Sequence, residues 1–405
     1  MSKGNMLKNR LLCGAMLTVT AAFVFFYGGI VPYAMLYTSL AIVTASLLYL
    51  AVIALYCDVV CTLDRFDVVK GGEIVLTIEI KNNSPLFMPY VIISHKKIDG
   101  FIYDANNETI SVAGFTGKRA HIVLTSKYRG RYDANIPQIR LMDFLGIANV
   151  RIKYARLPDV LVYPKVCEFS EFTAVGKFDM DNQMNPDNIS EDVTAVSDVR
   201  EYMDGDGIRK IHWNLSARML SFMSKNYENI TKSRLTLLIN LSGSNKNHEH
   251  EQKLMIEDKT IEAAVSVVFH FLSRLWNVTL CYYEKEYYTY SLSDTSMFGM
   301  AYDHLAFIEF SSAYDIARIV ENISVETAGE RLNLCVITQE ITDGLLDKII
   351  RYSELGSRIA LLYVCESKAD LGGADWVKAI SKSAVTLYAF DYDSVLSDAL
   401  SSPHI

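Results

Sequence analysis

The stretch RLTLLINLSGS, residues 234–244, decides the fold class of the C-terminal half of the chain. Residues 235–239 are an apolar run interrupted only by Thr236, which is typical of a strand buried on both faces of a sheet. A helical pattern follows from Ile256 to Leu275, and further apolar runs then alternate with helical ones up to Phe390. This alternation predicts a doubly wound, mostly parallel α/β domain of the Rossmann-like kind, with a β-hairpin over 277–283 and 287–292.

Polar side chains follow two of the predicted strands. The first strand delivers Asn240, Ser242 and Ser244, and a later one delivers Thr338 and Gln339. A ligand site is expected beyond the carboxyl ends of parallel strands. The arrangement resembles the von Willebrand factor A fold, whose metal-ion-dependent adhesion site uses Asp-x-Ser-x-Ser after the first strand and a Thr-Asp pair after the fourth.

Both aspartates of that adhesion site are replaced by amides in this chain, at Asn240 and Gln339. Mg²⁺ prefers oxygen ligands that include carboxylates. An amide oxygen brings no charge, and a unit charge at about 4 Å is worth roughly 4 kcal/mol at an effective dielectric constant of about 20. The sequence therefore predicts either a weakened Mg²⁺ site or an architectural remnant that binds through shape and neutral hydrogen bonds. It indicates no other cofactor.

The segment upstream of this strand, residues 199–218, carries a dense set of charged and aromatic residues. Residues 204–207, Asp-Gly-Asp-Gly, predict a turn whose Asp can cap a following helix, and residues 209–220 have helical character. Arginines alternate with aspartates here, so the segment can form a buried ion network. His212 is interpreted first as a packed, hydrogen-bonded histidine and second as a catalytic group.

This segment resembles the signature of the family called domain of unknown function 58. The matching positions, together with His212 between two of them, are the candidate partner-binding or signature residues: Arg200, Tyr202, Gly205, Asp206, Arg209, Ile211, His212, Trp213, Ser216, Ala217 and Arg218. The resemblance extends upstream to Arg129–Tyr132, Asp143–Gly146 and Tyr163-Pro164. It implies a membrane-anchored protein with a von Willebrand factor A-like domain that works with a MoxR-type AAA+ ATPase.

Two charge-free runs begin the chain, at about residues 11–30 and 34–57. About twenty helical residues cross a hydrocarbon core of about 30 Å, so the runs predict a transmembrane helical hairpin within residues 1–58. Lys3, Lys8 and Arg10 precede the first run, and the positive-inside rule then predicts a two-pass protein of the cell (plasma) membrane with cytoplasmic soluble domains. A cleaved signal peptide over 11–26 is the competing interpretation.

The region from 59 to 166 changes to a period of two, with Ile74, Leu76, Ile78 and Ile80 alternating with more polar residues. Short strands separated by turn clusters predict an antiparallel, Ig-like β-sandwich. Acidic residues then accumulate over 167–199, which predicts an acidic linker. The signature segment and the von Willebrand factor A-like domain complete the chain, over 200–405.

The composition excludes several functions. A net charge of −8 argues against nucleic acid as a partner, because such binding needs clustered cations. Seven cysteines without CxxC spacing indicate neither a disulfide framework nor a thiolate zinc site. The chain has no Gly-x-x-x-x-Gly-Lys-Ser/Thr loop and no Gly-x-Ser-x-Gly elbow.

Three functions stay open at this point. The first is a non-enzymatic adaptor that binds protein partners at the rim of Asn240, Ser242, Ser244 and Gln339, with a MoxR-like ATPase and membrane or envelope proteins as partners. The second is a metal-dependent enzyme that uses Asp204, Asp206 and His212. The third is a structural scaffold in envelope assembly.

Overall fold

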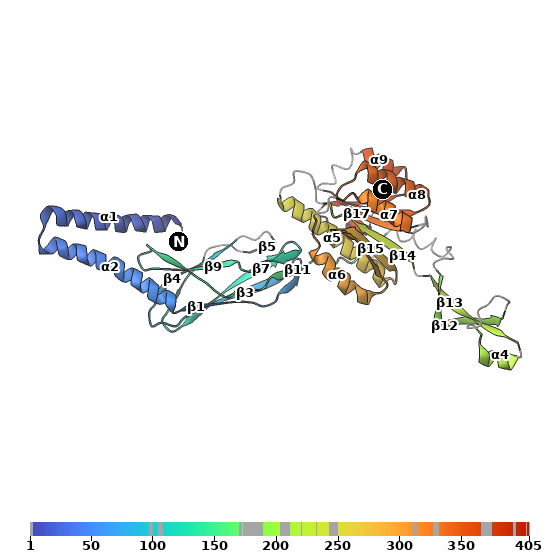
Figure 1. Ribbon diagram of the computed structural model, residues 1–405, viewed down its shortest axis with the longest axis horizontal. Coiled ribbons are helices and arrows are strands. Elements are labelled where there is room, and N and C mark those ends of the chain that lie inside the picture. The colour runs from blue at the N-terminus through green and yellow to red at the C-terminus, as the bar shows by residue number, and fades with distance from the viewer. Residues whose placement is uncertain are drawn as a thin grey trace. The chain divides into compact units, whose positions relative to one another are not determined.

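The computed structural model describes residues 3–96, 100–103, 108–169, 172, 189–202, 211–219, 221–231, 233–242, 250–310, 314–326, 332–365, 375–391, 394–401 and 403–404. The chain forms two compact units, Met1–Tyr163 and Pro164–Ile405 (Figure 1). Each unit has its own hydrophobic core, so each is described by itself.

Unit 1 begins with two apolar helices that lie side by side, α1 (Lys3–Tyr27) and α2 (Ile30–Leu55) (Figure 1). Both are long and apolar enough to cross a membrane. Only Gly28 and Gly29 separate them, with φ of 58° and 89°, values that favour glycine. The second helix begins before the predicted run at 34, because Pro32 lies in the first turn of α2, where its missing N–H has no helical partner to lose.

The rest of unit 1 is a β body. Two four-stranded sheets have the orders β1-β3-β7-β5 and β10-β9-β4-β6, and a smaller sheet has the order β2-β11-β8. The strands are β1 (Cys57–Leu63), β2 (Asp67–Val69), β3 (Glu73–Asn82), β4 (Met88–His95), β5 (Phe101–Ile102), β6 (Glu108–Val112), β7 (Gly117–Ser126), β8 (Gly130–Tyr132), β9 (Pro137–Met142), β10 (Asn149–Ile152) and β11 (Val160–Tyr163). The predicted alternation on β3 is confirmed, since Ile74, Leu76, Ile78 and Ile80 are all buried in the core.

The last turns of α2 belong to the core of the β body. Leu50 and Ile53 are buried among its strands, and Ser46 lies on the same helix face, one turn earlier. Residues spaced four and three apart lie on one face of a helix. Part of the second predicted span therefore packs against protein, a distinction that its uniformly apolar sequence does not make.

Unit 2 contains a six-stranded mixed sheet of order β16-β15-β14-β17-β18-β19. All neighbours run parallel except β16, which pairs antiparallel with β15 as the predicted hairpin. The strands are β14 (Arg234–Ile239), β15 (Asn277–Tyr283), β16 (Tyr287–Leu292), β17 (Asn333–Thr338), β18 (Arg358–Cys365) and β19 (Thr386–Asp391).

Helices cover both faces of this sheet. One core cluster joins it to α5 (His250–Ser273), α6 (Phe298–Phe307) and α10 (Leu396–Ser401), with the short η3 (Thr295–Met297) beside α6. A second cluster joins its other face to α7 (Ile316–Glu326), α8 (Asp343–Glu354) and α9 (Asp375–Ser381). The alternation of strand and helix predicted from the sequence is thus present.

The predicted acidic linker over 167–199 is wrong at both ends. Phe169 and Phe172 are buried in the core of unit 2, where Phe172 stacks on Tyr388 with ring centroids 4.7 Å apart. At the other end, β12 (Ile189–Glu201) pairs antiparallel with β13 (Met223–Thr231), and α4 (Trp213–Met219) lies between them in sequence. The strand β12 is held by β13, which lies more than twenty residues further along the chain. Its own acidic sequence, considered alone, therefore indicated a linker. Residues 170–171 and 173–188 lie outside the described residues.

Candidate functional site

The candidate site lies where β14 and β17 end. These strands are neighbours, they run parallel, and the helices that follow them, α5 and α8, cover opposite faces of the sheet. Such a switch point is where open α/β sheets bind ligands. Asn240 follows β14 directly, and Thr338 is the last residue of β17.

A hydrogen bond joins the two strand ends. Asn240 Nδ2 donates to Thr338 Oγ1 at 3.0 Å, and both side chains are buried. The other amide atom, Asn240 Oδ1, accepts from the backbone N–H of Ser242 at 3.0 Å. Both polar atoms of the Asn240 side chain are therefore engaged within the protein.

Gln339 makes a second connection across the same edge. Its Nε2 donates to the backbone carbonyl of Ser242, and the hydroxyl of Thr338 donates to the carbonyl of Glu340 at 2.6 Å. The Oε1 of Gln339 is buried and has no hydrogen-bond partner among the described residues. Ser244, the remaining predicted rim residue, lies outside the described part of the chain.

This arrangement has a chemical consequence for a cation. In the resembled adhesion site, carboxylates at the positions of Asn240 and Gln339 would supply negative charge, whereas here neutral amides hold the two loops together. For Asn240 to ligate Mg²⁺ through Oδ1, its hydrogen bond from Ser242 would have to weaken or break. The two amides also lack the carboxylate charge that a hard cation such as Mg²⁺ prefers among its ligands.

The described part of the signature segment ties α4 to β13. His212 Nδ1 accepts from the backbone N–H of Leu215 at 3.2 Å, and the hydroxyl of Ser216 donates to the carbonyl of His212 at 3.0 Å. Ser216 Oγ in turn accepts from the backbone N–H of Met223 at 2.9 Å. Ile211 is buried and bridges to Ser224. These contacts give His212 the role of a helix cap.

The same segment exposes aromatic side chains. Trp213 and Phe222 are 61% and 60% exposed, with ring centroids 6.4 Å apart, and Tyr202 lies 6.3 Å from Phe222. We call Tyr202, Trp213 and Phe222 the aromatic cluster. Sequence reasoning selected Tyr202 and Trp213 but missed Phe222, which the β12–β13 pairing brings beside them.

The structure describes only some of the other predicted signature residues. Ala217 and Arg218 lie exposed on α4, and Arg200 is in β12. Four others lie outside the described residues, namely Asp204, Gly205, Asp206 and Arg209. The metal-enzyme hypothesis needs Asp204 and Asp206 beside His212, and the described residues do not test that arrangement.

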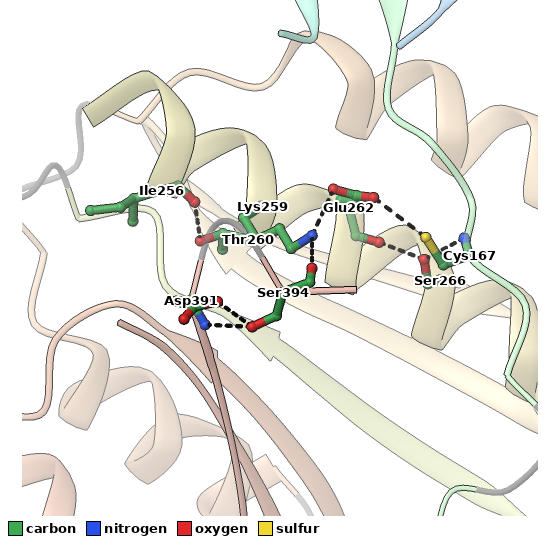
Figure 2. A network of polar contacts seen from close by, with 8 residues as sticks. All are labelled: Cys167, Ile256, Lys259, Thr260, Glu262, Ser266, Asp391 and Ser394. Carbon is green, nitrogen blue, oxygen red and sulfur yellow. Dashed lines mark hydrogen bonds and ion pairs between the residues drawn. The ribbon is translucent and has the colours of Figure 1, made fainter. Parts of the chain in front are cut away.

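A buried polar network in unit 2 was not predicted (Figure 2). Lys259 and Glu262 of α5 form a buried ion pair at 3.5 Å, and Lys259 Nζ also donates to the carbonyl of Ser394 at 2.9 Å. Cys167 Sγ donates to Glu262 Oε1 at 3.4 Å. Burial, and then the Glu262 carboxylate, raise the pKa of Cys167 to about 11, so its thiol stays protonated at neutral pH.

Because these partners come from three parts of the chain, the network fastens the segment before β12 and the turn after β19 onto α5. The i, i+3 spacing of the opposite charges Lys259 and Glu262, beside the largely apolar residues 263–269 of α5, was the signal that could have revealed it.

Comparisons with known proteins agree with the signature. Residues 198–293 match the family model described as "Protein of unknown function DUF58". The chain is 23% identical over 382 residues to the "Uncharacterized protein YeaD" of Bacillus subtilis (strain 168), with 89% of each chain covered.

Solved structures add no argument. The CARDB domain of the PF1109 protein from Pyrococcus furiosus, in complex with di-metal ions, matches at a TM-score of 0.18 and 16% identity, covering 26% of this chain and 94% of that one. The alkylpurine DNA glycosylase AlkC of Pseudomonas fluorescens matches at a TM-score of 0.15 and 10% identity, covering 34% of this chain and 41% of that one. Likeness this low supports no statement about fold or ligand.

Proposed function

The chain belongs to the family of proteins of unknown function DUF58, and on that premise we propose that it is a membrane-anchored, non-enzymatic adaptor that binds protein partners. α1 and α2 anchor it as a two-pass hairpin in the plasma membrane. Lys3, Lys8 and Arg10 precede the apolar part of α1, so the soluble domains are placed in the cytoplasm by the positive-inside rule.

Within this proposal the β body is an Ig-like sandwich and the α/β part of unit 2 is a von Willebrand factor A-like domain. The strand order of the six-stranded sheet, with β16 as its antiparallel edge, supports the second assignment. So does the position of Asn240 and Thr338 at the ends of adjacent parallel strands.

The observation that carries the adaptor function is the amide connection across the rim. Asn240 and Gln339 use side-chain N–H groups to hold the loops after β14 and β17 together, a task that a bound cation would otherwise perform. A rim fixed in this way is preorganised, which lowers the entropy cost of binding a protein partner.

The aromatic cluster is the second proposed contact surface. Tyr and Trp are enriched among the residues that dominate binding energy at protein interfaces. Trp213 and Phe222 are exposed although they are large and apolar, and the helix cap at His212 fixes the start of the helix that carries Trp213. In this chain the segment therefore combines a capped helix with an exposed aromatic surface.

A MoxR-type AAA+ ATPase, or a client that it remodels, is the partner that the family resemblance suggests. A scaffold in envelope assembly would instead retain membrane proteins without responding to nucleotide.

The test uses the full chain in nanodiscs with a MoxR-type ATPase from the same genome. We expect nucleotide-dependent binding or a change in ATP turnover, and a loss of it in Asn240→Ala/Gln339→Ala and in Trp213→Ala. Asn333→Ala is the matched control, because Asn333 Nδ2 donates to the carbonyl of Arg234 at the amino-terminal ends of the same two strands. Absence of binding and of any change in turnover would contradict the proposed partner.

A further inference from the structure

One turn of the β body is bound to both apolar helices. The turn that connects β9 to β10 accepts two hydrogen bonds from α1. Asn9 Nδ2 donates to the carbonyl of Leu145 at 2.9 Å, and Arg10 Nε donates to the carbonyl of Ile147 at 2.7 Å. From α2, Ser46 Oγ donates to Asp143 Oδ2 at 2.7 Å. The turn is therefore fixed at the level of residues 9–10 on one helix and residue 46 on the other.

The Asp143 carboxylate also fixes the shape of the turn. Asp143 is completely buried, and its two oxygens accept from the backbone N–H groups of Leu145 (3.2 Å) and Ala148 (2.8 Å). The turn nevertheless presents Phe144 to the outside, 58% exposed, with its ring 5.6 Å from that of Tyr49 on α2. An ordered turn thus holds a large apolar side chain in an exposed position.

A second loop of the β body lies beside the same helix face. The Tyr49 hydroxyl donates to the backbone carbonyl of Phe87, whose own side chain is 46% exposed. We call Tyr49, Phe87 and Phe144 the aromatic collar. Its three rings come from α2 and from two separate loops of the β body.

The open side of α2 shows how far a bilayer reaches. Away from the face that packs on the β body, the helix exposes large apolar side chains at the level of the collar, Leu47 and Leu48. On α1, the charge-free part from Leu11 to Tyr27 is only about 25 Å long at 1.5 Å per residue, which is short for a hydrocarbon core of about 30 Å. A bilayer that covers these residues extends to Arg10 and to the collar.

We propose that the aromatic collar lies in the headgroup region of the bilayer, so that the β body rests on the lipid surface. The proposal rests on the proposed function in requiring that α1 and α2 span the membrane. Tyr side chains favour this interfacial layer, and exposed Phe side chains insert at its boundary with the acyl chains. Arg10, which is bonded to the turn, and the exposed Lys8 two residues earlier on α1 favour anionic headgroups. The hydrogen bonds from both helices couple the anchor to this turn of the β body.

The experiment measures tryptophan quenching in the full chain, reconstituted in vesicles of phosphatidylcholine and phosphatidylglycerol. All three native tryptophans, Trp213, Trp276 and Trp376, lie in unit 2, so Phe144→Trp and Phe87→Trp add a reporter to unit 1. Phe66→Trp is the matched control. Phe66 is 49% exposed and follows the end of β1 that is farther from α2.

Vesicles whose acyl chains are brominated near the headgroup should remove the added emission of Phe144→Trp and Phe87→Trp but leave that of Phe66→Trp. Equal quenching at the three positions, or no quenching at Phe144→Trp, would overturn the proposal. Flotation separates this from failure of the anchor itself: a chain that floats with the vesicles but is not quenched contradicts the collar alone, and a chain that does not float contradicts the membrane anchor. A second copy or another membrane protein covering the collar would also leave it unquenched, and would overturn the lipid contact.

Discussion

Ser46 of α2 donates a hydrogen bond of 2.7 Å to the buried carboxylate of Asp143, in a turn of the β body. The two residues are 97 positions apart in sequence. This contact, with those from Asn9 and Arg10, couples the apolar helices to the β body.

Asp143→Ala should therefore destabilise unit 1 more than Ser46→Ala does. The first change removes three hydrogen bonds to a charged acceptor and the second removes one, so we expect losses of about 3 kcal/mol and about 1 kcal/mol. Thermal unfolding in detergent, followed by far-UV circular dichroism, measures both. Thr44→Ala is the control, because Thr44 is exposed and bonds only to its own helix. Equal effects of the three substitutions would contradict the coupling.

Unit 2 should lose stability in mild acid because of His270. Its ring stacks on Phe169 with centroids 4.2 Å apart, and burial, together with the nearby Arg274 cation, lowers its pKa from 6.5 to about 4. The folded state therefore binds fewer protons than the unfolded state between these values. The stability contributed by neutral His270 is complete above about pH 6.5 and is lost as the pH falls towards about 4.

Urea unfolding followed by tryptophan emission measures this loss, since every native tryptophan lies in unit 2. His270→Gln should flatten the stability curve between pH 6.5 and pH 4, whereas His121→Gln, at an exposed position in unit 1, should leave it unchanged. A curve of the same shape in His270→Gln and in the original chain would contradict the assignment.

The sequence predicted those parts of the fold that depend on local periodicity. The alternation on β3, the buried run of β14 and the β15–β16 hairpin follow from the spacing of apolar residues, and all three are present. The meeting of Asn240, Thr338 and Gln339 also followed, because parallel strands end at a common edge.

What the sequence did not predict depends on contacts between distant residues. Three such features are the pairing of β12 with β13, the burial of Phe169 and Phe172, and the packing of the last turns of α2 on protein. In each case the local sequence fits another environment equally well. The hydrogen bonds of Asn240 also depend on side-chain positions that spacing alone does not specify. The same holds for Glu262, which forms an ion pair with Lys259 and accepts a hydrogen bond from Cys167.

The buried ion pair of α5 should be sensitive to the loss of one partner. Lys259→Met leaves Glu262 buried without its cation and should cost about 3 kcal/mol, while Lys259→Met/Glu262→Leu should recover much of this loss. Urea unfolding measures both variants. Lys253→Met is the matched control, because Lys253 and Glu257 form a more exposed pair on the same helix, worth about 0.5 kcal/mol. A double variant as unstable as the single one would show that the network does not act as a pair.

Returning carboxylates to the rim should create a cation site. In Asn240→Asp/Gln339→Asp, the side-chain N–H groups that now hold the rim together are lost, and two negative charges meet at the ends of β14 and β17. We therefore expect the variant to be less stable than the original chain in EDTA, because like charges repel and two hydrogen bonds are missing. Mg²⁺ should restore stability in the variant alone, by about 2.7 kcal/mol when its free concentration is about 100 times the Kd.

Urea unfolding with and without Mg²⁺, and calorimetric titration, measure the effect. Asn333→Asp, at the other edge of the sheet, should gain no response to Mg²⁺. A response of equal size in the unchanged chain would mean that the amides of Asn240 and Gln339 already support a cation, and the adaptor proposal would lose the observation that carries it.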